Sequence, residues 1–298
     1  MTQSQITSLL ATSKSKRLPY VTKNKLEAWR LYDYEQHFLP VAIDIYKDNA
    51  VIHLFERVSQ SHIKEVEQFL RTSLHIQDFF YKNRTKEDLK IPPPPSKTIT
   101  INEYGHDFSI NLSDYLDTGI FLDHRETRKW VQEQSKDKVV LNTFAYTGSF
   151  SVYAAAGGAT KTYSVDLSKT YCEWIKKNIQ LNHLPEEKNW VYKMDTFEFF
   201  RYAARKKLTF DIIVIDPPTF SRNKGQSFSV QEDHPDLINQ ALQLLNPGGF
   251  IVFSNNKKDF RLSEELLDPC TVRDIQEETI PPDFTFAQTH WCFLIKPA

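Results

Sequence analysis

The sequence is poor in several features that would narrow its class. It contains only 8 glycines and 3 cysteines in 298 residues, and no apolar run approaches the ~20 residues that a membrane-spanning helix needs. So few glycines exclude a collagen-like chain, and three scattered cysteines form neither a disulfide framework nor a zinc-ligand pattern. The polar N-terminus lacks an apolar signal core, so we expect no secretion, no membrane contact and a cytoplasmic location.

What is present is the composition of an ordinary globular protein. The chain is 40% hydrophobic and 25% charged, and its net charge of −1 indicates no particular partner. At roughly 100–200 residues per domain, the length favours two domains. Basic residues nevertheless cluster at 14–25, 201–207 and 222–261, which matters only if the fold brings them to one surface.

The first third of the chain predicts a small α+β domain over residues 1–118. Strand-like runs at 41–46 and 51–57 precede an amphipathic helix at 59–74 and a further strand at 76–81. After a proline run, alternating apolar residues flank Gly105 in the pattern of a β-hairpin.

From residue 119 onward, strand-like and helical stretches alternate, which predicts a second, α/β domain over 119–298. The expected strands lie at 139–144, 160–165, 190–193, 210–215, 250–254, 272–277 and 291–295. Such alternation is typical of a parallel, doubly wound sheet. Ligands of these sheets bind at the carboxyl ends of the strands, where the strand order reverses.

The first of these strands ends in a tight turn, Asn142–Gly148. The turn has one glycine, whereas a dinucleotide-binding turn carries three that let the pyrophosphate approach the backbone. A nicotinamide or flavin dinucleotide is therefore disfavoured, and a cofactor without phosphates fits better. The alternative is an ordinary strand-to-helix turn.

Acidic residues follow the second and third strands. Asp166 stands where a carboxylate accepts hydrogen bonds from the ribose hydroxyls of an adenosine, or it simply precedes a helix capped by Ser168. Asp195 either contacts the adenine amino group or caps the next helix.

The fourth strand gives the most specific pattern, Asp216-Pro-Pro-Thr-Phe220 at the end of a buried apolar run. Proline fixes φ and removes an N–H group, so the two prolines hold Asp216 and the nearby carbonyls rigidly. Such acceptors can hold the edge of a base, and Phe220 can stack on it. The alternative is a strand that prolines merely end.

Taken together, these motifs resemble the class I S-adenosylmethionine-dependent RNA methyltransferases, and most closely the guanine-N7 methyltransferases of large-subunit (23S) ribosomal RNA. The resemblance runs from about Trp29 to the end and includes segments 114–125, 153–158, 216–221, 246–249, 253–256 and 280–284. It implies a Rossmann-like methyltransferase domain preceded by an RNA-binding α+β domain. It also implies S-adenosylmethionine as cofactor and ribosomal RNA as partner, with no metal, and it leaves the oligomeric state open.

The resemblance also implies the cofactor-binding residues. They are Asp123, Arg125, Asn142, Phe144, Ala145, Tyr146, Thr147, Gly148, Asp166, Leu167, Asp195 and Asp216. Arg125 is expected to meet the cofactor carboxylate. Asp123 and Glu126 have the alternative interpretation of a helix-capping pair.

The choice of target atom depends on the residue after the fifth strand. Related enzymes that form 5-methylcytosine place a cysteine nucleophile there, whereas this chain has Asn255, which can hydrogen-bond a guanine edge. Guanine N7 carries a free lone pair and needs only to be positioned. We therefore expect Asp216, Phe220 and Asn255 to position a guanine. A 5-methylcytosine enzyme and a catalytically inactive RNA-binding protein remain the alternatives.

Basic residues follow the fourth and fifth strands, at the edge of the sheet where Asp216 is expected. They are Arg222, Lys224, Lys257, Lys258 and Arg261. A basic rim around the reaction pocket suits an RNA backbone, so we expect these side chains to bind RNA phosphates.

Overall fold

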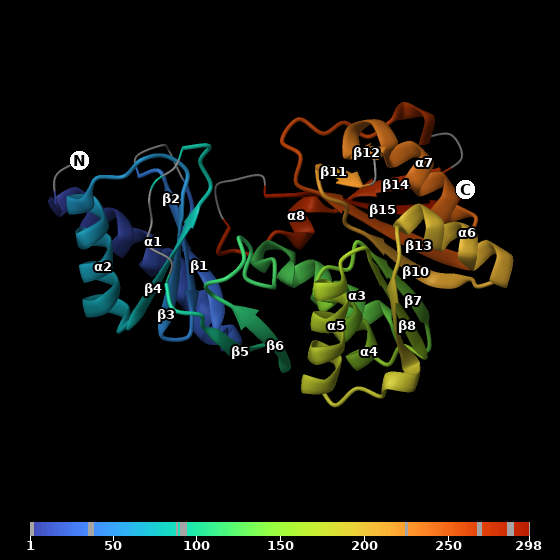
Figure 1. Cartoon of the computed structure of the whole chain (residues 1–298), viewed down its shortest axis with the longest axis horizontal. Helices are drawn as coiled ribbons and strands as arrows, with labels where there is room; N and C mark the ends of the chain where they lie inside the picture. Colours follow the sequence, from blue (N-terminus) through green and yellow to red (C-terminus); the bar gives the residue numbers. More distant parts are fainter. Residues whose placement is uncertain are drawn as a thin grey trace. The chain divides into compact units, whose positions relative to one another are not determined.

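The structure is a computed structural model that describes residues 3–34, 39–87, 89, 94–223, 226–266, 270–284 and 289–297. The chain divides into two compact units (Figure 1). Unit 1 comprises Met1–Leu122 and Pro281–Ala287, and unit 2 comprises Asp123–Ile280 and Gln288–Ala298. The sequence pattern placed the boundary after residue 118, and it assigned the segment that begins at Pro281 to the second domain.

Unit 1 contains a four-stranded sheet in the order β1-β2-β3-β4. The strands are β1 (Ala28–Tyr32), β2 (Val41–Tyr46), β3 (Asn49–Leu54) and β4 (Asp78–Asn83). β1, β2 and β3 pair antiparallel, and β4 runs parallel to β3 after the crossover helix α2 (Gln60–Leu74). A separate hairpin joins β5 (Thr98–Glu103) to β6 (His106–Asn111).

Helix α1 (Gln3–Asn24) was not expected from the sequence. Its buried residues recur every three or four positions: Ile6, Leu10, Ser13, Arg17 and Val21. Two of the five are polar, so the buried face does not stand out as an apolar stripe. Arg17 is 1% exposed, and its Nε donates to the carbonyl oxygen of Asp283 (2.8 Å), which ties the segment after Pro281 to unit 1.

Unit 2 is built on a seven-stranded sheet in the order β14-β15-β13-β10-β7-β8-β9. The strands are β7 (Val139–Thr143), β8 (Lys161–Asp166), β9 (Asn189–Lys193), β10 (Phe210–Ile215), β13 (Leu245–Asn255), β14 (Cys270–Asp274) and β15 (Trp291–Pro297). The first five of these pair in parallel, which confirms the doubly wound sheet. β15 departs from the parallel pattern, because it runs antiparallel between β13 and β14.

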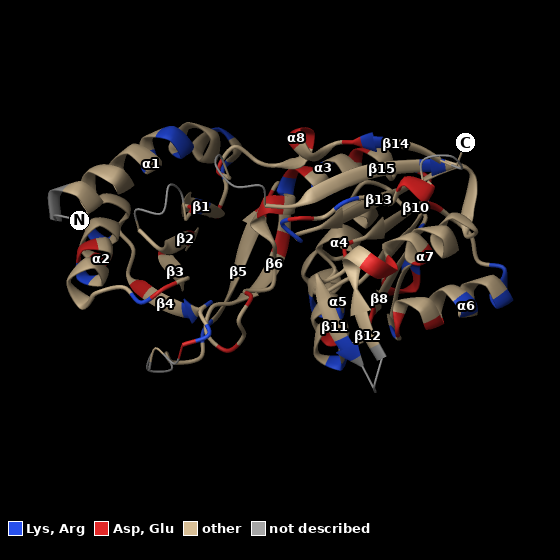
Figure 2. Ribbon diagram, turned by 90° about the horizontal axis from the view of Figure 1, so that it is seen from above, with Lys and Arg blue, Asp and Glu red and all other residues tan. Residues whose placement is uncertain are grey.

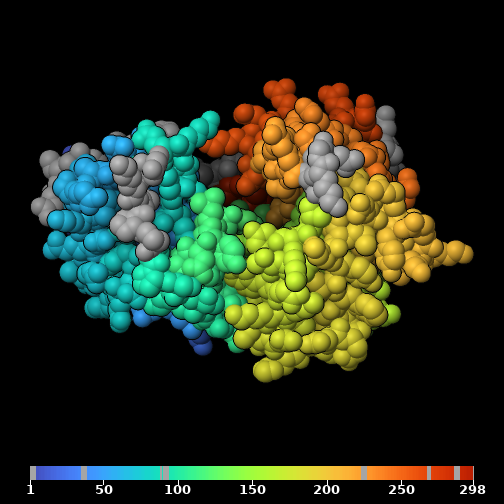
Figure 3. Space-filling model, in the orientation of Figure 1, coloured from blue at the N-terminus to red at the C-terminus, as the bar shows by residue number. Residues whose placement is uncertain are grey.

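Helices cover both faces of this sheet. α3 (Arg125–Gln134), α4 (Ser149–Ala156) and α5 (Lys169–Leu181) pack on one face, and α6 (Thr196–Lys206) and α7 (Val230–Leu242) pack on the other. Alternate residues of β10 pack into the hydrophobic cores on the two faces of the sheet. Ile212 and Val214 face α3 and α4, and Ile213 and Ile215 face α6 and α7. The space-filling view shows α5 (yellow-green) and α6 (yellow) on the visible surface of unit 2 (Figure 3).

Unit 2 also contains smaller elements. β11 (Phe220–Asn223) and β12 (Gln226–Ser229) form a hairpin after β10, and α8 (Gln276–Thr279) precedes the last strand. Within the described ranges, none of the helices is both long enough and apolar enough to cross a membrane.

The strand order of unit 2 reverses between β7 and β10. The chain proceeds from β7 to β8 on one side, and β10 is added on the other side of β7. The carboxyl ends of β7 and β10 therefore flank the position where doubly wound sheets bind their ligands. The turn after β7 and Asp216 after β10 lie at these two ends.

Candidate active site

The turn after β7 has a strained backbone. Phe144 and Tyr146 have φ values of 51° and 52°, in the left-handed region that costs side-chain-bearing residues roughly 1–2 kcal/mol each. Gly148 has a φ of 78°, and a Cβ there would lie 2.8 Å from Ile175 Cγ2. Strain of this kind concentrates at functional sites, where the surrounding structure enforces it.

Polar groups beneath the turn fix its shape. Asn142 is 2% exposed, and its Nδ2 donates to Ser151 Oγ (3.0 Å). The carbonyl oxygen of Thr147 accepts from Asn178 Nδ2 on α5 (2.9 Å). Among the turn residues expected at the cofactor, Asn142 and Thr147 thus face the protein, whereas the side chains of Phe144 and Tyr146 are half-buried.

Asp166 connects the turn to the end of β8. Its Oδ2 accepts from the backbone N–H of Tyr146 (2.9 Å), and its Oδ1 accepts from that of Ser168 (2.8 Å). Burial raises the pKa of the Asp166 carboxyl, and the two N–H groups oppose that shift. Each carboxylate oxygen retains a second lone pair, which is the acceptor that a ribose hydroxyl needs. The neighbouring Leu167 is 47% exposed.

Asp195 makes the contacts of a helix cap. Its Oδ1 accepts from the backbone N–H groups of Phe197 (2.9 Å) and Glu198 (3.2 Å) at the start of α6. The capping interpretation therefore describes its contacts within the chain, and a contact with adenine stays a prediction.

Asp216 follows β10 and has one hydrogen-bond partner and one further polar neighbour among the described residues. Its Oδ1 accepts from Ser254 Oγ on β13 (2.7 Å), and its Oδ2 lies 3.7 Å from His124 Nε2. Ser254 is fully buried, while the Asp216 side chain keeps 22% of its surface exposed. Nothing in the sequence indicated that Ser254 is a partner of Asp216, although Ser254 belongs to the same Phe253–Asn256 segment as Asn255.

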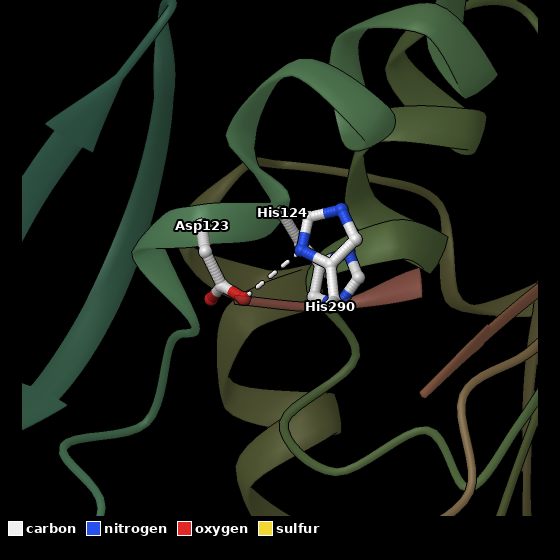
Figure 4. Close-up of side chains that lie close together, drawn as sticks. All are labelled: Asp123, His124 and His290. Carbon is white, nitrogen blue, oxygen red and sulfur yellow. Dashed lines mark hydrogen bonds and ion pairs between the residues drawn. The ribbon is translucent and has the colours of Figure 1, made fainter. Parts of the chain in front are cut away.

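Two buried histidines, His124 and His290, lie next to each other close to Asp123 (Figure 4). The rings of His124 and His290 are 4.0 Å apart and inclined by 21°. His290 Nδ1 lies 3.1 Å from Asp123 Oδ2 and is the donor, because a carboxylate only accepts. Burial, reinforced by His290, lowers the pKa of His124 to about 4, so that His124 is neutral at pH 7.

Asp123 has a partner that the sequence did not indicate. The sequence allowed Asp123 to cap the following helix together with Glu126. In the structure the residue preceding α3 is His124, whose side chain makes no capping bond, and Asp123 Oδ2 bonds His290 Nδ1. Arg125, the first residue of α3, is fully buried.

Three of these groups have spacing compatible with a metal ion. Within the described residues, ligand atoms of Asp123, His124 and His290 lie within 4.8 Å of one another. His290 Nδ1 is engaged by Asp123 and its Nε2 lies 3.2 Å from Thr279 Oγ1, so we assign no metal to this cluster.

The turns after β10 and β13 meet at the same edge of the sheet. Thr219 Oγ1 donates to Asn256 Oδ1 (2.7 Å). Phe220 is 52% exposed, and the Arg222 guanidinium lies 5.4 Å from its ring centroid. The other residues expected to bind RNA are half-buried Lys257 and exposed Lys258 and Arg261, while Lys224 lies outside the described residues. Figure 2 shows further Lys and Arg positions along α6.

Asn255 is placed differently from Asp216. It is 1% exposed, its Oδ1 accepts from the backbone N–H of Lys257 (3.1 Å), and its Nδ2 has no hydrogen-bond partner among the residues that the structure describes. Side chains alternate along a strand, so Asn255 points to the opposite face of β13 from Ser254, the residue that holds Asp216.

Cys292 is the cysteine that the sheet register places beside Ser254, the partner of Asp216. It pairs with Ser254 across β15 and β13 and is fully buried. Burial raises the pKa of the Cys292 thiol far above its usual range, so it is protonated at neutral pH. A protonated, inaccessible thiol is a poor nucleophile.

Fold and site together define a Rossmann-like enzyme that binds an adenosine cofactor without a pyrophosphate. The turn after β7 lacks the glycines of a dinucleotide site, and Asp166 has free lone pairs at the position suited to a ribose. Residues 72–289 match the S-adenosylmethionine-dependent methyltransferase family, and the chain belongs to that family.

Curated relatives extend the match over most of the chain. Ribosomal RNA large subunit methyltransferase K of Neisseria meningitidis is 37% identical over 94% of this chain and 83% of the relative. Ribosomal RNA large subunit methyltransferase K/L of Shewanella sediminis is 41% identical over 89% of this chain but only 39% of the relative. The chain thus spans well under half the length of the K/L relatives.

Solved structures agree with the fold. A putative methyltransferase in complex with SAH (S-adenosylhomocysteine) matches 99% of this chain and 82% of that chain, with a TM-score of 0.86 and 30% identity. A putative SAM-dependent methyltransferase from Streptococcus mutans has a TM-score of 0.84, also at 30% identity. The chain is thus an S-adenosylmethionine-dependent methyltransferase.

Proposed function

We propose that this methyltransferase acts in the cytoplasm on N7 of a guanine in large-subunit ribosomal RNA. The support for an RNA substrate is that relatives with 36–41% identity over most of the chain are named as methyltransferases of that RNA. The choice of N7 is supported by the chemistry around Asp216, where the target base is proposed to bind, because no cysteine there is a usable nucleophile. Asp216 bonds Ser254 Oγ, and the Cys292 thiol beside Ser254 in the sheet register is buried and protonated.

On the cofactor side, S-adenosylmethionine supplies an electrophilic methyl carbon on a positively charged sulfur. We assign its ribose hydroxyls to the free lone pairs of Asp166, and its carboxylate to Arg125. The remaining proposed cofactor contacts are Asp123, Phe144, Ala145, Tyr146, Gly148, Leu167 and Asp195, and we assign Asp216 to the target base instead. Because Asn142 and Thr147 bond to the protein interior, we assign them the role of holding the turn in shape.

On the base side, Asp216 accepts hydrogen bonds from N–H groups of the guanine, and the exposed ring of Phe220 stacks on it. The N7 lone pair then forms the new bond to the methyl carbon while the sulfur keeps the electron pair of the broken bond. Positive charge thereby passes to the guanine. A fixed carboxylate near the base favours that charge more in the transition state than in the ground state.

We propose a different role for Asn255 from a direct base contact. Its buried Oδ1 holds the backbone of Lys257, and Trp291 Nε1 donates to the Lys257 carbonyl oxygen (3.0 Å). Asn255 thus fixes the turn that carries Lys257 and Lys258. We assign these lysines, with Arg222, Lys224 and Arg261, to the RNA phosphates, and we assign additional RNA binding to unit 1.

Transfer to cytosine C5 is the second candidate, because Cys292 lies next to Ser254 in the sheet register. That reaction needs a thiolate that reaches C6 of the cytosine. Burial of Cys292 and its raised pKa argue against it.

The proposal is tested with Asp216→Asn, which keeps the shape of the side chain but removes the charge. We expect methyl incorporation into undermethylated ribosomal RNA to fall by at least tenfold, while cofactor affinity changes less than threefold, as order-of-magnitude figures for a lost charge-assisted hydrogen bond. Normal turnover by this variant would contradict the assignment of Asp216 to the target base.

A further inference from the structure

Two buried histidines of unit 2 are not used by the proposed reaction. His124 and His290 are 4% and 1% exposed, and together they fill the space between Asp123 and Asp216. Buried imidazoles are costly to leave unpaired, so the contacts of each ring nitrogen show what the pair does.

The ring of His290 is fixed at both nitrogens. Nδ1 donates to Asp123 Oδ2, and Nε2 lies 3.2 Å from Thr279 Oγ1 at the end of α8. Rotation of this ring would break both contacts. His290 is therefore a rigid platform for the ring that stacks on it.

The ring of His124 is fixed by its neighbours. It stacks on His290, meets Phe150 edge-on (5.8 Å, 62°), and has Nδ1 3.4 Å from Thr127 Oγ1. This arrangement leaves Nε2 directed at Asp216 Oδ2, 3.7 Å away. Such contacts are often long without substrate and shorten in the reacting complex.

We propose that His124 and His290 form a positioning pair that fixes the orientation of Asp216. Ser254 holds Oδ1 of the carboxylate and His124 holds Oδ2, while His290 acts only through His124. The inference rests on the proposed role of Asp216 at the target base. The charged and titratable groups around His124 are Asp216, Asp123, His290 and Arg128. A neutral His124 leaves the negative charge of Asp216 available to the base.

The test is a double-mutant cycle on kcat with His124→Phe, His290→Phe and the double variant. Phenylalanine keeps the stacked ring and removes the nitrogen contacts. We expect His124→Phe to lower kcat by about 10²-fold, the scale of a misplaced reacting group, and His290→Phe to lower it less. Because His290 acts through His124, the double variant should be no slower than His124→Phe. His124→Gln, which keeps a donor, should restore much of the loss.

A merely structural role is distinguished by two controls. Cofactor affinity, measured by titration calorimetry with S-adenosylhomocysteine, should stay within about twofold in His124→Phe and His124→Gln. His234→Gln removes another buried histidine of unit 2, which bonds the Val230 carbonyl oxygen and the backbone N–H of Ser263. It should lower thermal stability but not kcat.

The outcomes separate this inference from the proposed function. Loss of kcat in Asp216→Asn with normal kcat in His124→Phe would overturn the positioning pair alone. Normal kcat in Asp216→Asn would overturn the role of Asp216 itself. Losses that multiply in the double variant would show that His290 does not act through His124. If the phenylalanine variants fail to fold, the same cycle with leucine at both positions, which also removes the nitrogen contacts, decides the question.

Discussion

Substitution of Asp166 by alanine should separate cofactor binding from folding. The carboxylate accepts two backbone N–H groups from the chain and, in the proposed complex, the ribose hydroxyls. Hydrogen bonds to a charged group contribute about 1.5–3 kcal/mol each, so loss of one ribose bond corresponds to a roughly 10- to 150-fold weaker cofactor. Loss of the bonds to Tyr146 and Ser168 also lowers the free energy of unfolding, because the turn after β7 loses its support.

The assay is calorimetric titration of Asp166→Ala with S-adenosylhomocysteine, with thermal unfolding measured in parallel. Asp211→Ala is the matched control, because Asp211 accepts from Val139 N (2.7 Å) and Asn246 Nδ2 (3.1 Å) near the start of β10, the opposite end from Asp216. The control should lose stability and keep its cofactor affinity. A folded Asp166→Ala variant that binds within twofold of wild type would refute the ribose assignment.

The basic residues after β13, the buried His124 and the turn glycine Gly148 each allow a further test. Lys257→Ala with Lys258→Ala should weaken RNA binding in filter-binding titrations. The slope of the logarithm of the binding constant against the logarithm of salt concentration should become shallower by about 0.7 per lost phosphate contact. Lys176→Ala with Lys177→Ala on α5 should leave this slope unchanged. The low pKa of His124, about 4 against ~6.5 in the unfolded chain, means that its contribution to stability is complete above pH 6.5 and is lost as the pH falls toward 4. From pH 7 to pH 5, the free energy of unfolding measured with urea should therefore fall by about 2 kcal/mol more in wild type than in His124→Gln. Equal decreases would show that His124 is not held neutral. Gly148→Ala should destabilise unit 2 by about 1–3 kcal/mol more than Gly248→Ala, because both positions have positive φ but only Gly148 has Ile175 within 2.8 Å of the added Cβ. Similar unfolding midpoints for the two variants would contradict the close packing of the turn.

The parallel core of unit 2 was readable from the sequence because its strands are apolar and separated by helices. β10 has the bounds that the sequence predicted, Phe210–Ile215. For its neighbours in the sheet, β7 and β13, the observed bounds differ from the predicted ones by a few residues. The antiparallel direction of β15 could not be predicted, because the pattern of apolar residues along a strand is the same for either strand direction. Helix α1 was missed because Ser13 and Arg17 lie within its buried face.

The site was only partly readable, because its contacts join distant parts of the chain. Asp166 and Asp216 were found from their places at strand ends. His290 pairs with Asp123, 167 residues earlier, so no spacing in the sequence could reveal it. The placement of Asn255 also depends on which residues of β13 point to each face of the sheet, and Ser254 and Asn255 point to opposite faces.

We propose that this enzyme methylates N7 of guanine without a covalent intermediate. The direct measurement is nucleoside mass spectrometry after incubation with undermethylated ribosomal RNA and methyl-labelled S-adenosylmethionine. We expect label in 7-methylguanosine, in wild type and equally in Cys292→Ser, because the buried thiol takes no part. Label in 5-methylcytosine that disappears in Cys292→Ser would contradict it.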